Sequence, residues 1–90
     1  MELRLANHVN TAEIDGELVL LDVATGNFYG LNQTGSILIK IIEGNQNIEI
    51  DNFINQMAEV WNVDFKDLEN DVMAFINTMK TKGLIYEVNS

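Results

Sequence analysis

The segment LLDVATGNFYGLNQTGSIL, residues 20–38, contains the change from strand to helix that decides the fold. Its first residues end an apolar run that starts at Leu18, and such a run is typical of a strand. The turn VATGN carries Gly26, where a positive φ is favoured, and the chain returns as FYGLN. Thr34 is a good helix N-cap, so the segment predicts two antiparallel strands followed directly by a helix.

The residues before this segment predict one further strand. In TAEIDGELVLLD, Asp15 and Gly16 form a hairpin signal because apolar residues flank them on both sides. Together with the turn at Gly26, this signal predicts a three-stranded antiparallel sheet joined as a meander.

The residues after the sheet predict helices from the spacing of their apolar side chains. The first helix is expected from Thr34 to just before Gly44, since glycine is a common helix stop. The second is expected over about 50–61, with apolar residues at offsets of three and four. The sequence leaves its start open between two residues, Asn47 and Asp51.

The third helix has the clearest start and stop signals. Asp64 is the expected N-cap, Asp67 follows three residues later, and Gly83 ends the helix so that Leu84 packs back on it. The final LIYEV is interpreted as a short strand or an extended tail. A three-stranded antiparallel sheet followed by three helices predicts an α+β fold, winged helix-turn-helix-like, in a single domain of residues 1–90.

Composition limits the partners. The chain is 47% apolar and 21% charged, which is typical of a globular protein, and it has no cysteine. Its net charge of -9 disfavours nucleic acid and anionic membranes, because binding phosphate requires Lys and Arg, and favours a basic or neutral partner. The N-terminus lacks signal-peptide features and no run is long enough to cross a membrane, so we predict a cytoplasmic protein.

The sequence contains no pattern that predicts catalysis. His8 is the only histidine, so one chain cannot form a His-based metal cluster or a Ser-His-Asp triad. Four acids at the start of the third helix do not share one face, and negative charge is favourable at a helix N-terminus, so we interpret them as capping rather than metal-binding residues: Asp64, Asp67, Glu69 and Asp71. We therefore predict no enzyme activity, no metal and no cofactor.

The strand NFYGLN is apolar on both of its faces. Because side chains alternate along a strand, Tyr29 and Leu31 share one face while Phe28 and Gly30 share the other. An apolar strand at the edge of a sheet promotes aggregation unless the edge is covered or used. Gly30 leaves room for another chain to approach.

Two features stay open at this point. Alternate residues of NFYGLN direct their N–H groups to opposite sides, and either set can face the free edge. On the third helix, Met73 and Thr78 mark opposite margins of the apolar stripe, and either margin can line a groove.

Two segments, ELVLLDVATGNFYGLNQTGSIL and NDVMAFINTMKTKGLI, resemble the PqqD-like proteins. These are RiPP recognition elements, the peptide-recognition domains of ribosomal peptide modification pathways. The shared pattern is LLD-x-x-x-G-x-x-Y-x-LN-x-TG, then D-V-x-x-F and a terminal G-L, between Glu17 and Ile85. The short chain, without a fused enzyme domain, and the sequence of the first motif resemble the standalone leader-binding proteins of lasso peptide biosynthesis. That pathway is a branch of natural product biosynthesis.

The resemblance implies a non-catalytic protein that binds the leader of a precursor peptide as an added antiparallel strand, in a cleft between the third strand and the third helix. It assigns the strand edge to Asn27, Phe28, Tyr29, Gly30 and Leu31. It assigns the helix wall to Asp71, Val72, Phe75 and Met79. The implied partners are the precursor leader and a leader peptidase or radical SAM modifying enzyme, near which the bound leader holds its core peptide.

Two alternative functions stay open. A winged-helix transcriptional regulator that binds DNA has the same coarse fold. However, only three basic residues lie on or beside the third helix, Lys66, Lys80 and Lys82, and they are outnumbered by four acids there, which disfavours phosphate contacts. A self-associating structural module would pair edge to edge as a homodimer, which a concentration series by light scattering detects.

Overall fold

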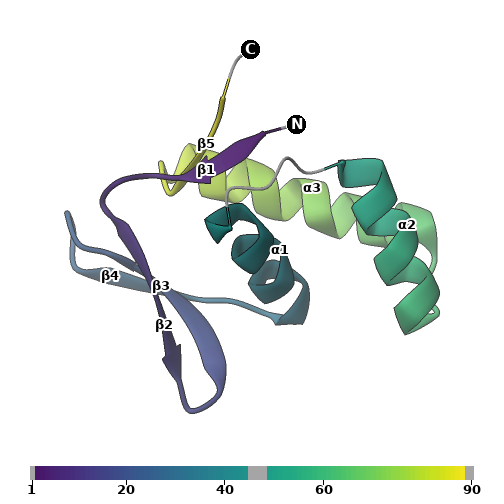
Figure 1. Cartoon of the computed structure of the whole chain (residues 1–90), viewed down its shortest axis with the longest axis horizontal. Helices are drawn as coiled ribbons and strands as arrows, with labels where there is room; N and C mark the ends of the chain where they lie inside the picture. The colour runs from purple at the N-terminus through teal and green to yellow at the C-terminus, as the bar shows by residue number, and fades with distance from the viewer. Residues whose placement is uncertain (1, 45–48, 89–90) are drawn as a thin grey trace.

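The computed structural model describes residues 2–44 and 49–88. Within these residues the elements follow in the order β1 (Leu3–Leu5), β2 (Val9–Ile14), β3 (Glu17–Asp22), β4 (Asn27–Gly30), α1 (Gln33–Glu43), α2 (Ile50–Trp61), α3 (Phe65–Thr81) and β5 (Ile85–Glu87). In Figure 1 the sheet of β2, β3 and β4 lies on one side of the molecule and the helices lie on the other. The predicted α+β fold, a three-stranded antiparallel sheet followed by three helices, is confirmed.

The three-stranded sheet is the expected meander, with the strand order β2-β3-β4. Asp15 (φ 53) and Gly16 (φ 81) both have positive φ, as a two-residue hairpin turn requires. Gly26 (φ 80) also has the positive φ that its turn was expected to need. Both predicted turns are therefore confirmed.

A second, two-stranded sheet joins the ends of the described chain. β1 pairs antiparallel with β5, with Leu3 opposite Glu87, and Figure 1 shows the two strands side by side above α1. The predicted short strand in LIYEV is therefore confirmed as β5. The sequence patterns did not predict β1, because three residues are too few for alternation to be detected and its only partner is distant in the sequence.

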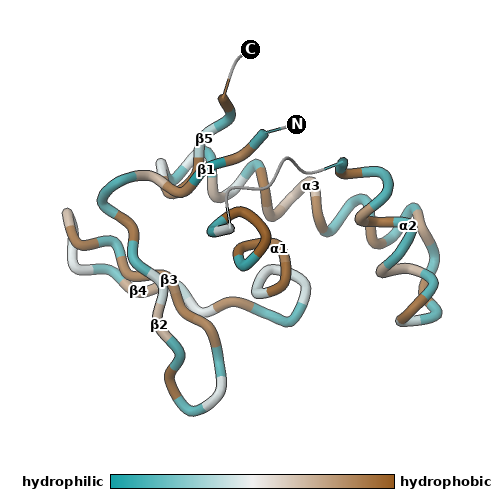
Figure 2. Tube along the Cα trace, viewed as in Figure 1, coloured by the Kyte–Doolittle hydropathy of each residue, from teal (hydrophilic) through white to brown (hydrophobic). Residues whose placement is uncertain are grey.

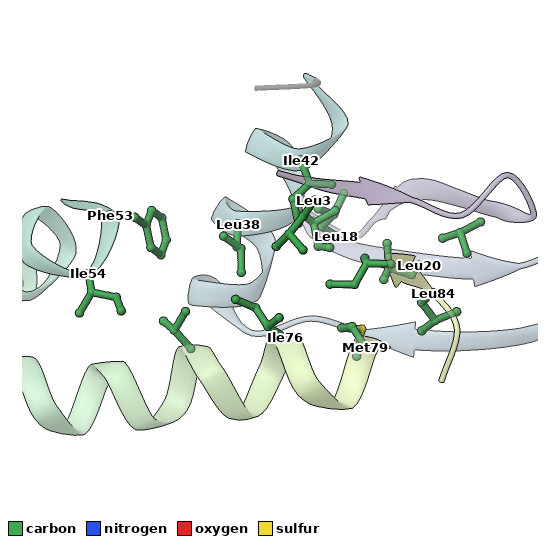
Figure 3. Close-up of a cluster of buried hydrophobic side chains, with 14 of the residues drawn as sticks. Leu3, Leu18, Leu20, Leu38, Ile42, Phe53, Ile54, Ile76, Met79 and Leu84 are labelled. Carbon is green, nitrogen blue, oxygen red and sulfur yellow. The ribbon is translucent and has the colours of Figure 1, made fainter. Parts of the chain in front are cut away.

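The core lies between β3, the helices and the β1–β5 pair. Figure 3 shows Leu18 and Leu20 of β3 pointing toward the helices, where Leu38 of α1 and Ile76 of α3 point back at them. The fully buried larger side chains come from all of these elements: Leu3, Leu20, Leu38, Ile39, Ile42, Ile54, Ile76, Leu84 and Val72. Burial of such side chains on one face of each element is what holds sheet and helices together.

The start of α1 differs from the prediction. Asn32, not Thr34, is the N-cap, and its side-chain oxygen accepts a hydrogen bond from the Gly35 N–H at 2.8 Å. The prediction of Thr34 was wrong because both residue types cap helices, and only the position at which the chain leaves β4 decides between them. The helix does end before Gly44, but that glycine has φ -74 and is not left-handed.

The caps of α3 agree with the sequence. Asp64 accepts hydrogen bonds from the backbone N–H groups of Lys66 and Asp67. At the other end Gly83 has φ 72, and the Leu84 N–H donates to the Met79 carbonyl at 2.9 Å. This arrangement is a Schellman motif, in which the buried Leu84 packs back on the helix as expected.

The start of α2 falls inside the predicted interval. The helix begins at Ile50, one residue before Asp51, while Asn47 lies outside the described residues. The buried side chains of α2 are Phe53, Ile54 and Ala58, which follow the predicted three-and-four spacing.

The corrected N-cap gives a direct test on stability. We expect Asn32→Ala to lower the free energy of unfolding by about 1 kcal/mol, because it removes the acceptor for an otherwise unpaired N–H. Thr34→Ala, inside the helix, should change that free energy by less than about 0.5 kcal/mol, as ordinary substitutions away from caps do. Urea unfolding of the two variants measures this difference. A larger loss for Thr34→Ala than for Asn32→Ala would show that the cap is assigned to the wrong residue.

Candidate peptide-binding site

β4 is an edge strand, and its hydrogen bonds divide its residues into two sets. The Leu31 N–H donates to the Leu18 carbonyl at 3.2 Å, which continues the β3–β4 ladder. Hydrogen-bonded pairs alternate along an antiparallel ladder, so Tyr29 also directs its N–H and C=O toward β3. Phe28 and Gly30 direct theirs to the opposite side. No strand of the described residues pairs with that side, so these two residues present a free edge.

The side chains of β4 follow the same alternation. Tyr29 lies opposite the buried Leu20, and both Tyr29 and Leu31 pack against the core on the face toward the helices. Phe28 lies opposite Leu21 on the other face and is 63% exposed. A Cβ added to Gly30 would have no atom within 4 Å. The free edge is therefore bordered by two core-packed side chains on one face and by open space on the other.

One contact places α3 beside this strand, and a second places it beside the start of α1. The Lys82 Nζ lies 5.4 Å from the centroid of the Tyr29 ring, within cation–π range. At the start of α1, a Cβ built on Gly35 would lie 2.9 Å from Cε1 of Phe75, closer than a real Cβ contact. The absence of a side chain at Gly35 thus lets α1 approach α3 just where the chain has left β4.

These contacts decide which margin of α3 faces the strand. Residues three, four and seven apart share a helix face, so Thr78 lies on the same side as Phe75 and Lys82. Met73 lies on the other margin, together with Lys80, whose Nζ is 3.0 Å from a carboxylate oxygen of Glu87 on β5. We call the side toward β4 the α3 stripe, which consists of Asp71, Phe75, Thr78 and Lys82.

The structure divides the four α3 residues singled out from the sequence. Asp71 is exposed and Phe75 is partly buried, and both belong to the α3 stripe. Val72 has no exposed surface and Met79 is 6% exposed, so both lie in the core. Their contribution to a binding surface would be support for the stripe beside them.

The five strand residues lie together, from Asn27 at the start of β4 to Leu31 just after its end. Three further residues complete the surface and were not assigned from the sequence: Gly35, Thr78 and Lys82. Only Thr78 had a signal, its position at a margin of the apolar stripe. The roles of Gly35 and Lys82 depend on contacts between elements, which no local pattern encodes.

Asp22, the acid of the LLD motif, has a structural role. Its carboxylate accepts hydrogen bonds from the backbone N–H groups of Ala24 and Thr25, at 2.9 and 3.3 Å, and its side chain is buried. His8 Nε2 lies 4.0 Å from the same carboxylate. These contacts hold the turn between β3 and β4 and so fix where β4 begins.

The described residues offer no group of three or more metal-ligating side chains close enough to hold an ion.

A cavity of about 360 Å³ lies under the β2–β3 hairpin and the start of α1, lined by Glu13, Gly16, Glu17, Leu18, Leu31, Asn32, Gln33, Ser36 and Lys40. None of its lining residues belongs to α3, so it is separate from the α3 stripe, and it shares only Leu31 with the five strand residues. Within residues 2–44 and 49–88, each helix is too short or too polar to cross a membrane.

The family model for coenzyme PQQ synthesis protein D (PqqD) matches residues 17–85 of the chain. The chain belongs to the PqqD family. The match covers β3, β4 and all three helices, the same span over which the two sequence motifs resemble PqqD-like proteins, so that resemblance is confirmed. No curated protein sequence matches this PqqD-family chain.

Two solved structures share the fold of this PqqD-family chain. TbiB1, in complex with the TbiA(beta) leader peptide, is 25% identical, with a TM-score of 0.77 over 97% of this chain and 99% of TbiB1. A lasso peptide synthetase B1 complexed with its leader peptide is 23% identical, with a TM-score of 0.82 over 96% of this chain and 99% of its own. Both alignments therefore span nearly the whole of each compared chain.

The contact between Gly35 and Phe75 is testable. Gly35→Ala gains about 1 kcal/mol of helix propensity. It also forces a methyl group against the Phe75 ring, and overpacking typically costs about 1–3 kcal/mol. We expect a net loss of stability in urea unfolding, together with a shift of the Phe75 ring signals by NMR.

Ser36→Ala is the matched control, because it raises propensity at the neighbouring position without adding a group. It should leave both readouts near those of the wild type. If Gly35→Ala instead gains stability and the Phe75 signals stay in place, the two helices are not in close contact there.

Proposed function

We propose that this PqqD-family chain is a non-catalytic adaptor that binds the leader of a ribosomally made precursor peptide and presents it to a separate enzyme. The leader adds to β4 as a further antiparallel strand. The observation that carries the proposal is the free edge, at which Phe28 and Gly30 direct their N–H and C=O groups away from β3. The leader complexes of TbiB1 and of the lasso peptide synthetase B1 support it.

Binding by strand addition separates affinity from selectivity. Backbone hydrogen bonds to Phe28 and Gly30 are available to any extended peptide. Side chains on every second leader residue would lie over Tyr29 and Leu31 and against Phe75, which favours apolar residues at that spacing. Asp71 is exposed beside them and suits a Lys or Arg of the leader.

Presentation to the enzyme follows from tethering. A leader held on β4 keeps the core peptide near the active site of a leader peptidase, as in a lasso-type pathway, or of a radical SAM enzyme. The gain is effective concentration rather than new chemistry. We place this adaptor in the cytoplasm, where a ribosomal precursor is made.

Proline substitutions test strand addition, and the structure now states which positions to change. Gly30→Pro removes an N–H that faces the free edge, so the protein should stay folded and lose one hydrogen bond to the leader. That loss is about 0.5–1.5 kcal/mol, or up to about tenfold in affinity. Tyr29→Pro removes an N–H that faces β3 and should lower the melting temperature markedly. The measurements are a thermal melt and a fluorescence titration with a synthetic precursor leader.

Gly30→Ala is the matched control for the edge position. It keeps the N–H, and its Cβ enters open space, so affinity for the leader should match the wild type. Strand addition at β4 is excluded if Gly30→Pro is folded and binds the leader as tightly as Gly30→Ala does.

The net charge of -9 gives a separate test against the DNA-binding alternative. A leader that carries Lys or Arg should bind more weakly as the salt concentration rises, because salt screens its attraction to the acidic protein. Double-stranded DNA should not bind at low salt, where phosphate contacts are strongest. Tight DNA binding without leader binding in the same titration would favour a transcriptional regulator.

A further inference from the structure

The sheet has a second apolar face, directed away from the helices. The register places five apolar side chains on it, and we call this surface the outer face: Ala12, Ile14, Val19, Leu21 and Phe28. None of the five belongs to the core cluster or packs against it, and Ile14 and Phe28 are 50% and 63% exposed. Figure 2 shows the continuous apolar colouring along β3.

This composition is unusual for a sheet that is covered on one side. An antiparallel sheet with one solvated face normally alternates between apolar and polar residues. β3 does not alternate, because Leu18 to Leu21 is a continuous apolar run of the kind found in strands buried on both faces. The described chain covers only the face of Leu18 and Leu20. The sequence of β3 therefore indicates that another molecule covers the outer face.

Charge limits what that molecule can be. Residues 9–31, which contain the whole sheet, carry no Lys or Arg and four acids: Glu13, Asp15, Glu17 and Asp22. Asp15 and Glu17 are exposed at the hairpin tip, beside Ile14. A second copy would bring two acidic tips and two chains of net charge -9 together, which is unfavourable. The complementary surface is an apolar patch bordered by Lys or Arg.

The outer face is also continuous with the free edge. Phe28 directs its N–H and C=O to that edge, while its side chain lies on the outer face. A leader strand added to β4 would place alternate side chains next to Phe28 and so extend the outer face. A protein docked there would contact the adaptor and the bound leader together.

From these observations we infer that the outer face is the docking surface for the enzyme that processes the leader-bound precursor. The inference rests on the proposed function and names a surface of the adaptor that, apart from Phe28, does not itself hold the leader. The enzyme contributes an apolar patch with a basic border. It binds the leader-loaded adaptor more tightly than the free adaptor, because the leader strand adds contact area beside Phe28.

The test uses the full chain saturated with its leader and, as the probe, the purified leader peptidase or modifying enzyme of its pathway. Ile14→Lys adds a positive charge to the outer face, and it lies opposite Glu17, which can pair with it without harming the fold. Leu21→Thr removes apolar surface and introduces a β-branched residue, a type that strands favour. Val60→Lys is the control, since Val60 is an exposed apolar residue on α2, outside the sheet.

Ile14→Lys and Leu21→Thr should each weaken enzyme binding about tenfold by calorimetry, while their leader affinity stays within twofold of the wild type. Val60→Lys should change neither. Unchanged enzyme affinity in both outer-face variants overturns the inference, as does an equal loss in Val60→Lys or a failure of the enzyme to bind the wild type. It is also overturned if light scattering shows a wild-type dimer that the outer-face variants abolish. Failure of the proposed function is distinguishable, since the wild type would then not bind the leader at all.

Discussion

The structure depends on one geometric constraint, the two-residue period of an antiparallel strand. The direction of the backbone hydrogen bonds and the direction of the side chain both alternate along β4, so the two are linked. Tyr29 and Leu31 pair with β3 and pack toward the core. Phe28 and Gly30 leave their backbone at the free edge and their side-chain positions on the outer face. One residue set thus anchors the strand, and the other is available to partners.

The anchoring set also fixes where α3 lies. Tyr29 contacts Lys82 at the C-terminal end of α3. Gly35, five residues after the end of β4, contacts Phe75 in the middle of α3. Between these contacts the chain has only the short link that ends at the Asn32 cap. A short connection with contacts at both ends leaves α3 little freedom to slide along β4. The spacing between edge and helix is therefore built into the fold, and a peptide does not have to create it.

Local signals in the sequence were sufficient for most elements. The hairpin glycines, the Asp64 cap, the Gly83 stop and the three-and-four spacing of α2 each act within a few residues, and the structure agrees with them. Asn32 and Thr34 could not be separated in this way, because the N-cap is set by where the preceding strand ends. Three features depend on contacts between residues distant in the sequence: which β4 residues face the free edge, which side of α3 faces β4, and which strand pairs with β1. The periodicity of a segment carries no information about such contacts. The candidate site is formed from such contacts, so its residue types were predictable while its orientation was not.

The apolar run in β3 connects the adaptor's stability with its proposed partners. Leu18 and Leu20 serve the core, whereas Val19 and Leu21 contribute to no core contact within the described chain. Their apolar character is therefore not needed to fill the core, and a sheet with one solvated face normally has polar residues at such positions. Since Leu21 lies opposite Phe28, any protein that covers this face also meets the edge to which the leader is proposed to add. Binding at the two surfaces must then be coupled, and coupling is reciprocal: an enzyme that prefers the loaded adaptor also strengthens the hold of the adaptor on its leader. An adaptor of this design releases the leader most readily after the enzyme has left.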